Sequence, residues 1–184
     1  MEQLNPHSRR DVFGSKINRD HSPLLVYGIP WLTILIGSLA PMLPVIAPAP
    51  ILPPLGYLML LAWRMLRPGL LPLWSGFPLG LFDDIFSGQP LGSAILLFSV
   101  TLIALDLLEF RFPWRGFVQN WLIATLFILA YLPIAALVSG GAIGLGQLPL
   151  LLPQLLLSLA VFPIVMGVVA LFDRARLLRL RKIG

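Results

Sequence analysis

Charged residues are missing from two long stretches of this chain, and these stretches indicate its architecture. No Asp, Glu, Lys or Arg occurs between Asp20 and Arg64, or between Arg115 and Asp173. About 20 apolar residues are enough for a helix to cross a bilayer. Each stretch is therefore long enough for two spans. Prolines over 48–54 divide the first stretch, and a glycine-rich segment over 139–147 divides the second.

The same pattern predicts an all-α, polytopic membrane protein with six transmembrane helices. Pro and Gly just beyond Arg67 end the second helix, and a turn over 87–90 ends the third. The expected helices cover residues 24–46, 51–66, 70–87, 91–110, 117–138 and 149–172. They form one domain over 23–173, which lies between a polar tail (1–22) and a basic tail (174–184). Composition agrees, because 58% of the 184 residues are hydrophobic and only 11% are charged, more apolar than a soluble domain.

The 13 Lys and Arg residues indicate the topology. Four lie in the N-terminal tail, two in the second-to-third loop, two in the fourth-to-fifth loop and five in the C-terminal tail, whereas the other three loops have none. Basic residues accumulate on the cytoplasmic side, so we expect both termini to be cytoplasmic. The net charge of +5 then reflects topology and contact with anionic membrane lipids, and we expect no nucleic-acid partner.

Residues at the cytoplasmic ends of the predicted helices are expected to face the membrane interface. Arg64 and Arg67 can extend to the headgroups, and Glu109 and Arg111 are interpreted as solvated charges at a helix end. Four tryptophans form the expected aromatic belt: Trp63, Trp74, Trp114 and Trp121.

The chemistry of an enzyme is missing from the apolar region. The chain has no Cys, and both histidines, His7 and His21, lie in the N-terminal tail. Neither Ser–His catalysis nor a His-bound metal is therefore available within the spans. The adjacent Asp83 and Asp84 point about 100° apart on a helix, which does not suit a cooperating acid pair. We expect no enzymatic activity, no cofactor and no metal site.

Small residues and one acid recur at every fourth position around the third predicted helix: Gly76, Gly80, Asp84, Gly88 and Gly92. As far as Gly88 these positions share one helix face, and a face of small residues allows two helix backbones to approach closely. Asp84 is then either a cap within a packed helix pair or part of a functional site, because ionisable residues at membrane depth are typically functional.

Asp84 needs hydrogen-bond donors if this face is buried. The expected donors are backbone N–H groups of the following turn and of the start of the fourth helix, together with Gln154 of the sixth helix. We expect Asp84→Ala to impair function and Asp84→Asn to be tolerated. Asp83→Ala should be mild, because Asp83 lies off the stripe.

The segment 80–92 reads Gly-Leu-Phe-Asp-Asp-Ile-Phe-Ser-Gly-Gln-Pro-Leu-Gly. It resembles the signature of the rod shape-determining MreD family, Gly-Leu-x-x-Asp-x-hydrophobic-x-Gly-x-Pro-Leu-Gly. Asp84 stands at the family aspartate, and Asp83 stands at a variable position. Chain length and the basic C-terminus also agree, whereas the longer N-terminal tail and the proline-rich first outer loop depart from the family. The other matching positions are Gly80, Leu81, Gly88, Pro90, Leu91 and Gly92.

The resemblance implies a non-enzymatic subunit of the bacterial cell-elongation (rod) complex in the cytoplasmic membrane, supporting lateral peptidoglycan synthesis and cell shape. It implies as partners an MreC-type periplasmic scaffold, a RodA-type glycosyltransferase and its transpeptidase partner. It also implies a fold similar to the six-helix substrate-binding subunits of energy-coupling-factor transporters. Stripe and signature together form the candidate structural or partner-binding motif: Gly76, Gly80, Asp84, Gly88, Pro90, Leu91 and Gly92.

A second interpretation is a substrate-binding or transport subunit for a small molecule. In that case Asp84 would face a pocket that is open to the outside.

Overall fold

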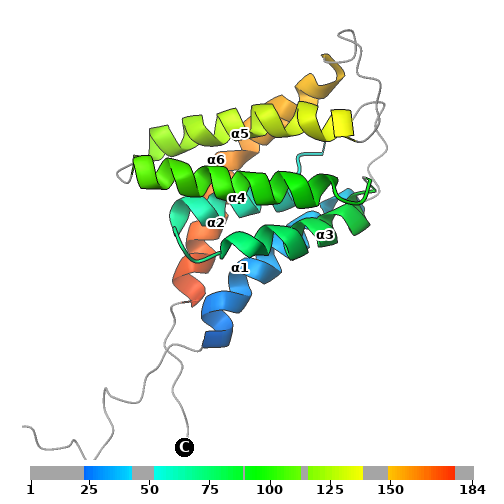
Figure 1. Cartoon of the computed structure of the whole chain (residues 1–184). Helices are drawn as coiled ribbons and strands as arrows, with labels where there is room; N and C mark the ends of the chain where they lie inside the picture. Colours follow the sequence, from blue (N-terminus) through cyan, green and yellow to red (C-terminus); the bar gives the residue numbers. More distant parts are fainter. Residues whose placement is uncertain (1–22, 43–51, 89, 113–115, 139–148, 177–184) are drawn as a thin grey trace, which may run out of the picture.

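The described part of the chain is helical and contains no β-strand. The computed structural model describes residues 23–42, 52–88, 90–112, 116–138 and 149–176 (Figure 1). Six α-helices follow in chain order: α1 (Pro23–Ser38), α2 (Leu55–Leu66), α3 (Gly76–Ser87), α4 (Ser93–Arg111), α5 (Phe117–Val138) and α6 (Leu152–Arg176). Short 3-10 turns, η1 (Ala40–Met42) and η2 (Leu73–Ser75), follow α1 and precede α3. The all-α prediction is confirmed for these residues.

Each helix predicted from the sequence has a counterpart; the fifth has the predicted boundaries, the fourth differs by one or two residues and the sixth by three or four, and the first three differ for identifiable reasons. The first α-helix ends at Ser38 and continues only as the η1 turn, because prolines at 41 and 44 supply no backbone N–H for the helix. The second begins at Leu55, after the last proline of the run. The third begins at Gly76 rather than near residue 70, since Leu73–Ser75 form the separate η2 turn. The rest of the first predicted helix, 43–46, lies outside the described residues.

Four helical segments are long and apolar enough to cross a membrane: Leu25–Met42, Ser93–Arg111, Phe117–Val138 and Pro149–Arg176. The chain is therefore consistent with an all-α protein embedded in a membrane. Helices α2 and α3 have 12 residues each, which corresponds to roughly 18 Å, whereas the hydrocarbon core is roughly 30 Å thick. The sixfold crossing and the cytoplasmic termini remain predictions.

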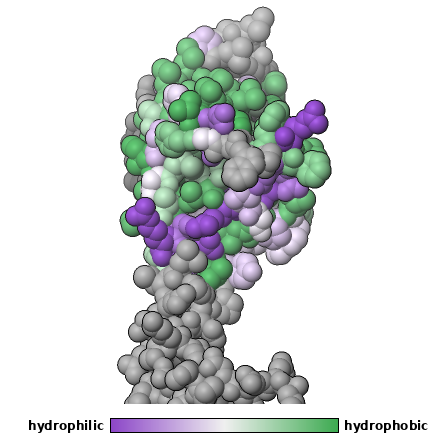
Figure 2. All heavy atoms as spheres, turned by 90° about the vertical axis from the view of Figure 1, so that its left-hand side faces the viewer, coloured by the Kyte–Doolittle hydropathy of each residue, from purple (hydrophilic) through white to green (hydrophobic). Residues whose placement is uncertain are grey.

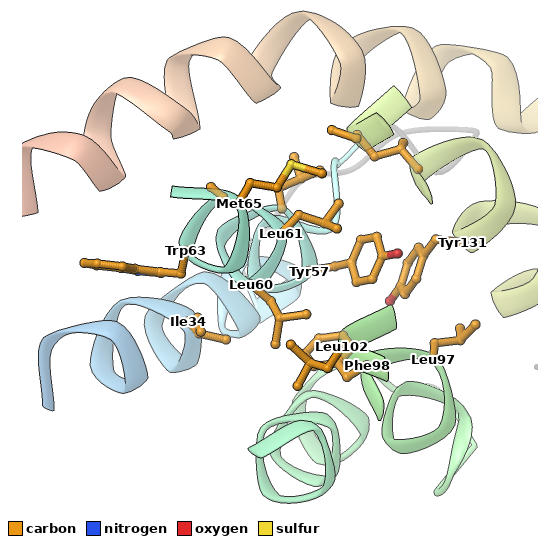
Figure 3. Packing of buried hydrophobic residues seen from close by; sticks show 14 of the residues in the cluster. Ile34, Tyr57, Leu60, Leu61, Trp63, Met65, Leu97, Phe98, Leu102 and Tyr131 are labelled. Atoms are coloured by element: carbon orange, nitrogen blue, oxygen red, sulfur yellow. The ribbon is translucent and has the colours of Figure 1, made fainter. Parts of the chain in front are cut away.

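Helix α2 lies at the centre of the fold and packs against α1, α4 and α6 (Figure 1). Nine of its twelve residues are buried. Figure 3 shows Leu60 and Trp63 of α2 close to Ile34 of α1, and Phe98 and Leu102 of α4 on the neighbouring side. An apolar helix that is enclosed on several sides in this way can be short, because its neighbours rather than lipid cover it.

The outer helices expose apolar side chains, as expected for surfaces that face lipid. Large hydrophobic residues are exposed along α4, α5 and α6. On the face drawn in Figure 2, hydrophobic residues predominate, and many of the hydrophilic ones gather toward its lower end. Without a bilayer such a surface would promote aggregation, so it supports a membrane location.

Candidate functional site

Helices α3 and α4 form a tightly packed hairpin, and two glycines of the stripe allow this packing. A Cβ atom at Gly80 would lie 2.5 Å from the Cα of Ile95, and one at Gly76 would lie 2.7 Å from the Cα of Ser99. Real Cβ atoms do not approach backbone this closely. The predicted small-residue face is therefore confirmed at Gly76 and Gly80, and its partner is the next helix of the chain. Gly88 lies outside the contact, because nothing is within 4 Å of a Cβ position there.

The Asp84 side chain caps the N-terminus of α4 from the preceding helix. Its Oδ2 atom accepts hydrogen bonds from the backbone N–H groups of Gly92 at 2.8 Å and Ile95 at 3.3 Å, and its Oδ1 atom accepts from the N–H of Ala94 at 2.7 Å. The Ser93 hydroxyl lies 2.9 Å from Asp84 Oδ1 and equally far from the Pro90 carbonyl oxygen. The first N–H groups of a helix have no partner within the helix, and Asp84 supplies one.

The electrostatics of this cap are favourable as well. A helix N-terminus carries a partial positive charge, which favours an adjacent carboxylate. A carboxylate has about four acceptor positions. Three backbone N–H groups at the start of α4 bond to the two Asp84 oxygens, and the Ser93 hydroxyl is shared between Asp84 and the Pro90 carbonyl. Only 2% of Asp84 is exposed. The expected hydrogen bonding from the start of the fourth helix is thus confirmed.

The two remaining glycines of the stripe shape the turn between the helices. Gly88 ends α3 with φ of 69°, and Gly92 precedes α4 with φ of 105°. Both values lie in the left-handed region, which residues with a Cβ rarely adopt. Between the two glycines, Pro90 and Leu91 point outward, and Leu91 is 74% exposed.

Gln154 does not bind Asp84, so that part of the expectation is wrong. Its amide Nε2 donates instead to the carbonyl oxygen of Leu52 at 2.7 Å. This bond joins α6 to the segment before α2. It satisfies a backbone carbonyl of a proline-rich segment, where helical hydrogen bonds are not available.

Asp83 is buried next to Asp84 but faces other helices. It is 7% exposed, and its Oδ1 atom lies 3.0 Å from where a Cβ atom of Gly56 in α2 would stand. The same point is 2.2 Å from the Ser38 Oγ atom at the end of α1. The two acids thus diverge, as expected from their 100° separation on a helix, and each lies within the protein.

Ion pairs between a buried arginine and two more exposed acids, at the other end of the bundle, were not anticipated from the sequence. Arg64 is 4% exposed and pairs with Asp106 and, at 3.3 Å, with Glu109. Its predicted extension toward the headgroups is therefore wrong. Glu109, predicted to be a solvated end charge, is partly exposed and also pairs with Arg64. The pairs join α2 to α4. Arg111 is exposed, as expected.

A second ionic cluster joins α2 to α6. Asp173 accepts from Arg67 at 2.8 Å and from Arg176 at 2.7 Å. The hydrogen bond to Asp173 and the charge of that carboxylate raise the pKa of Arg67 above its ordinary value. Arg176 also donates to the Val26 carbonyl at 3.2 Å, which brings α1 into the cluster.

Trp63 does not belong to the aromatic belt that was expected at the membrane interface. It is fully buried, donates from Nε1 to Thr33 Oγ1 at 2.8 Å, and lies beneath the Arg176 guanidinium at 5.7 Å. It belongs to the core because α2 is enclosed by other helices. Trp74 and Trp121 are exposed, as a belt requires, and Trp114 lies outside the described residues.

Within the described ranges, no group of three or more His, Cys, Asp or Glu side chains is placed to hold a metal ion. The geometry of the α3–α4 hairpin is that of a structural joint, in which Asp84 is occupied by contacts with α4 and Leu91 is exposed.

Comparison with known proteins identifies no relative: no protein-family model, no curated protein and no solved structure matches this chain.

Proposed function

We propose that this chain is a non-enzymatic, multi-pass subunit of the bacterial cell-elongation (rod) complex in the cytoplasmic membrane, where it supports lateral peptidoglycan synthesis and cell shape. One observation carries the proposal. The residues that resemble the MreD signature are the ones that build the α3–α4 joint and leave Pro90 and Leu91 exposed beside it. Gly80 allows the contact, Asp84 caps α4, and Gly88 and Gly92 set the turn.

The signature residues divide into a supporting part and an exposed part. Those just named are occupied by contacts within the hairpin. Pro90 and Leu91 make up the exposed part, and Leu91 has the most exposed side chain among the large hydrophobic residues of the turn and the start of α4. Leu91 directly precedes Gly92, whose N–H group is bonded to Asp84. An exposed apolar residue anchored in this way suits contact with a partner, because little conformational entropy is lost on binding. We therefore assign Leu91 to the contact with a partner of the MreC or RodA type.

The first test is depletion of the protein in its own bacterium. The proposal predicts loss of rod shape, visible by microscopy within a few generations. Cells that stay rod-shaped after complete depletion would contradict the proposal directly.

The second test places serine at Leu91 and, as a matched control, at Leu96. Leu96 is also an exposed leucine, 53% exposed on α4, but it lies outside the signature. We expect Leu91→Ser to reach the membrane in normal amounts, to fail to restore rod shape, and to recover less MreC-type scaffold on purification. Leu96→Ser should behave as wild type. Equal behaviour of the two variants would refute the assignment of Leu91.

The interpretation as a small-molecule binding subunit was based on Asp84 facing an open pocket, and the structure does not support this placement. Both oxygens of that carboxylate accept hydrogen bonds from α4, so none is directed toward a ligand. Copurification separates the two functions, since a scaffold retains partner proteins and a binding subunit retains a ligand.

A further inference from the structure

Two arginines share one carboxylate at the corner where α1, α2 and α6 meet. The Nε and Nη2 atoms of Arg67 lie 2.9 and 2.8 Å from Oδ2 of Asp173, and Nη2 of Arg176 lies 2.7 Å from Oδ1. Both oxygens of the buried Asp173 are thus engaged. Two positive charges and one negative charge leave the cluster with an excess of one positive charge. A charge in a poorly solvated place is costly without a counter-charge.

The excess charge is accessible on Arg67. Its side chain is 48% exposed, and Asp173 engages the Nε and Nη2 atoms, which leaves the Nη1 group for a second acceptor. Arg176, in contrast, is buried and donates to the Val26 carbonyl. Arg174, which directly follows Asp173, is exposed and belongs to none of the ion pairs between described residues. The corner therefore presents the guanidinium groups of two arginines, while its acid is buried.

Both ends of the helical domain reach this corner. Arg176 is the last residue of α6, and its bond to Val26 places the first turn of α1 beside it. Figure 1 shows the start of α1 and the end of α6 at the same end of the bundle. Clusters of basic residues next to a transmembrane helix are typical of contact with anionic lipids. The sequence adds four bases within six residues of these two helix ends: Arg19, Arg179, Arg181 and Lys182.

The ionic cluster between α2 and α4 has the opposite balance, although its arginine also comes from the end of α2. There the buried Arg64 faces two acids, and the side chain of one of them, Asp106, is half exposed. Arg111, two residues beyond Glu109, is exposed and brings the sum of the charges to zero. An exposed carboxylate repels an anionic headgroup. The two clusters therefore differ in the ligands that they can attract.

We propose that the α1–α2–α6 corner binds the phosphate of an anionic phospholipid such as phosphatidylglycerol through Arg67 and Arg174, and that the α2–α4 cluster does not. A guanidinium presents several N–H donors in one plane, which suits phosphate oxygens. A lipid fits better than a soluble anion, because the exposed apolar side chains of Leu171 and Phe172 directly precede Asp173 and offer a surface for acyl chains. The proposal requires a membrane location, and it is independent of the cell-elongation role.

The test is the binding of single lipid molecules to the purified full-length protein in detergent, measured by native mass spectrometry. Phosphatidylglycerol and phosphatidylcholine with the same acyl chains are titrated separately. We expect the first phosphatidylglycerol to bind more tightly than the first phosphatidylcholine, because only the former carries a net negative charge. Equal affinity for the two lipids would overturn the proposal, and so would displacement of phosphatidylglycerol by an equal concentration of inorganic phosphate.

Three variants locate the site. Arg174→Gln removes an exposed charge outside the ion pairs and should weaken the binding of the first phosphatidylglycerol about fivefold, which is the contribution of one basic residue near an anionic surface. Arg67→Gln should weaken it at least as much. Arg111→Gln, the matched control at the α2–α4 cluster, should leave it unchanged. Phosphatidylcholine should bind all three variants as it binds the wild type, which reports that the fold is retained.

The control decides between one site and a diffuse field. If Arg111→Gln weakens phosphatidylglycerol binding as much as Arg174→Gln does, the basic residues act only through the total charge of the protein, and the assignment to this corner is refuted. The measurement uses purified protein, so its outcome is separate from that of the cell-shape tests.

Discussion

Replacing Asp84 by alanine tests the α3–α4 joint most directly, because several donors share this one acceptor. The N–H groups of Gly92, Ala94 and Ile95 lose their partner in Asp84→Ala. Loss of a helix cap costs about 1 kcal/mol, and a buried donor left unsatisfied costs roughly 1–3 kcal/mol. Ala94 is buried and the other two are partly buried. We therefore expect a total loss of roughly 2–4 kcal/mol in the free energy of unfolding.

Asp84→Asn removes the charge and one acceptor oxygen of the side chain but keeps nearly the same shape. Both carboxylate oxygens accept N–H bonds, so in either orientation the amide NH2 group would face an N–H donor of α4. Because of this contact, we no longer expect asparagine at position 84 to be tolerated as well as the native aspartate. We expect a loss of roughly 1–2 kcal/mol, about half of the alanine effect.

The measurement is unfolding of the purified variants in detergent, followed by tryptophan fluorescence, together with their abundance in membranes by immunoblot. Ile85→Ala is the matched control, because Ile85 is the next residue and is 59% exposed. Surface substitutions of this kind usually change stability by about 0.5 kcal/mol or less. If Asp84→Ala unfolds at the same temperature as Ile85→Ala, the cap does not stabilise the hairpin and the reasoning fails.

Three further predictions concern packing, charge and topology. Gly80→Leu should destabilise the hairpin by roughly 1–3 kcal/mol through overpacking, whereas Gly28→Leu should be nearly neutral, because nothing lies within 4 Å of a Cβ there; equal melting temperatures would contradict the close contact. Arg64→Met should cost less stability than joint amide replacement of its two acidic partners, because the second change leaves a buried charge without compensation; the opposite order in thermal unfolding would refute this. Since the chain has no native Cys, a thiol at Gly116 should be labelled only after permeabilisation, and one at Gln89 from outside; external labelling at Gly116 would break the six-helix topology.

The sequence by itself determined the features whose signals are local. Charge-free stretches and proline or glycine breaks located all six helices, because these signals depend on neighbouring residues and on the lipid environment. The α3–α4 joint was also predictable. Asp84 and its donors lie only 8 to 11 residues apart, and the four-residue spacing of Gly76, Gly80 and Asp84 is set by the helix itself.

Only the tertiary structure decided which residues far apart in sequence meet. Trp63 and Arg64 are residue types that are common at a membrane interface. In the structure they are buried, because α1, α4 and α6 enclose α2. The partners of Arg64 lie more than 40 residues away, and Arg67 bonds to Asp173 across 106 residues. The neighbours of Asp83 named above, Ser38 and Gly56, come from α1 and α2. Helical periodicity gives the direction of a side chain from its own axis, but the identity of the opposing helix depends on how the six helices pack against one another.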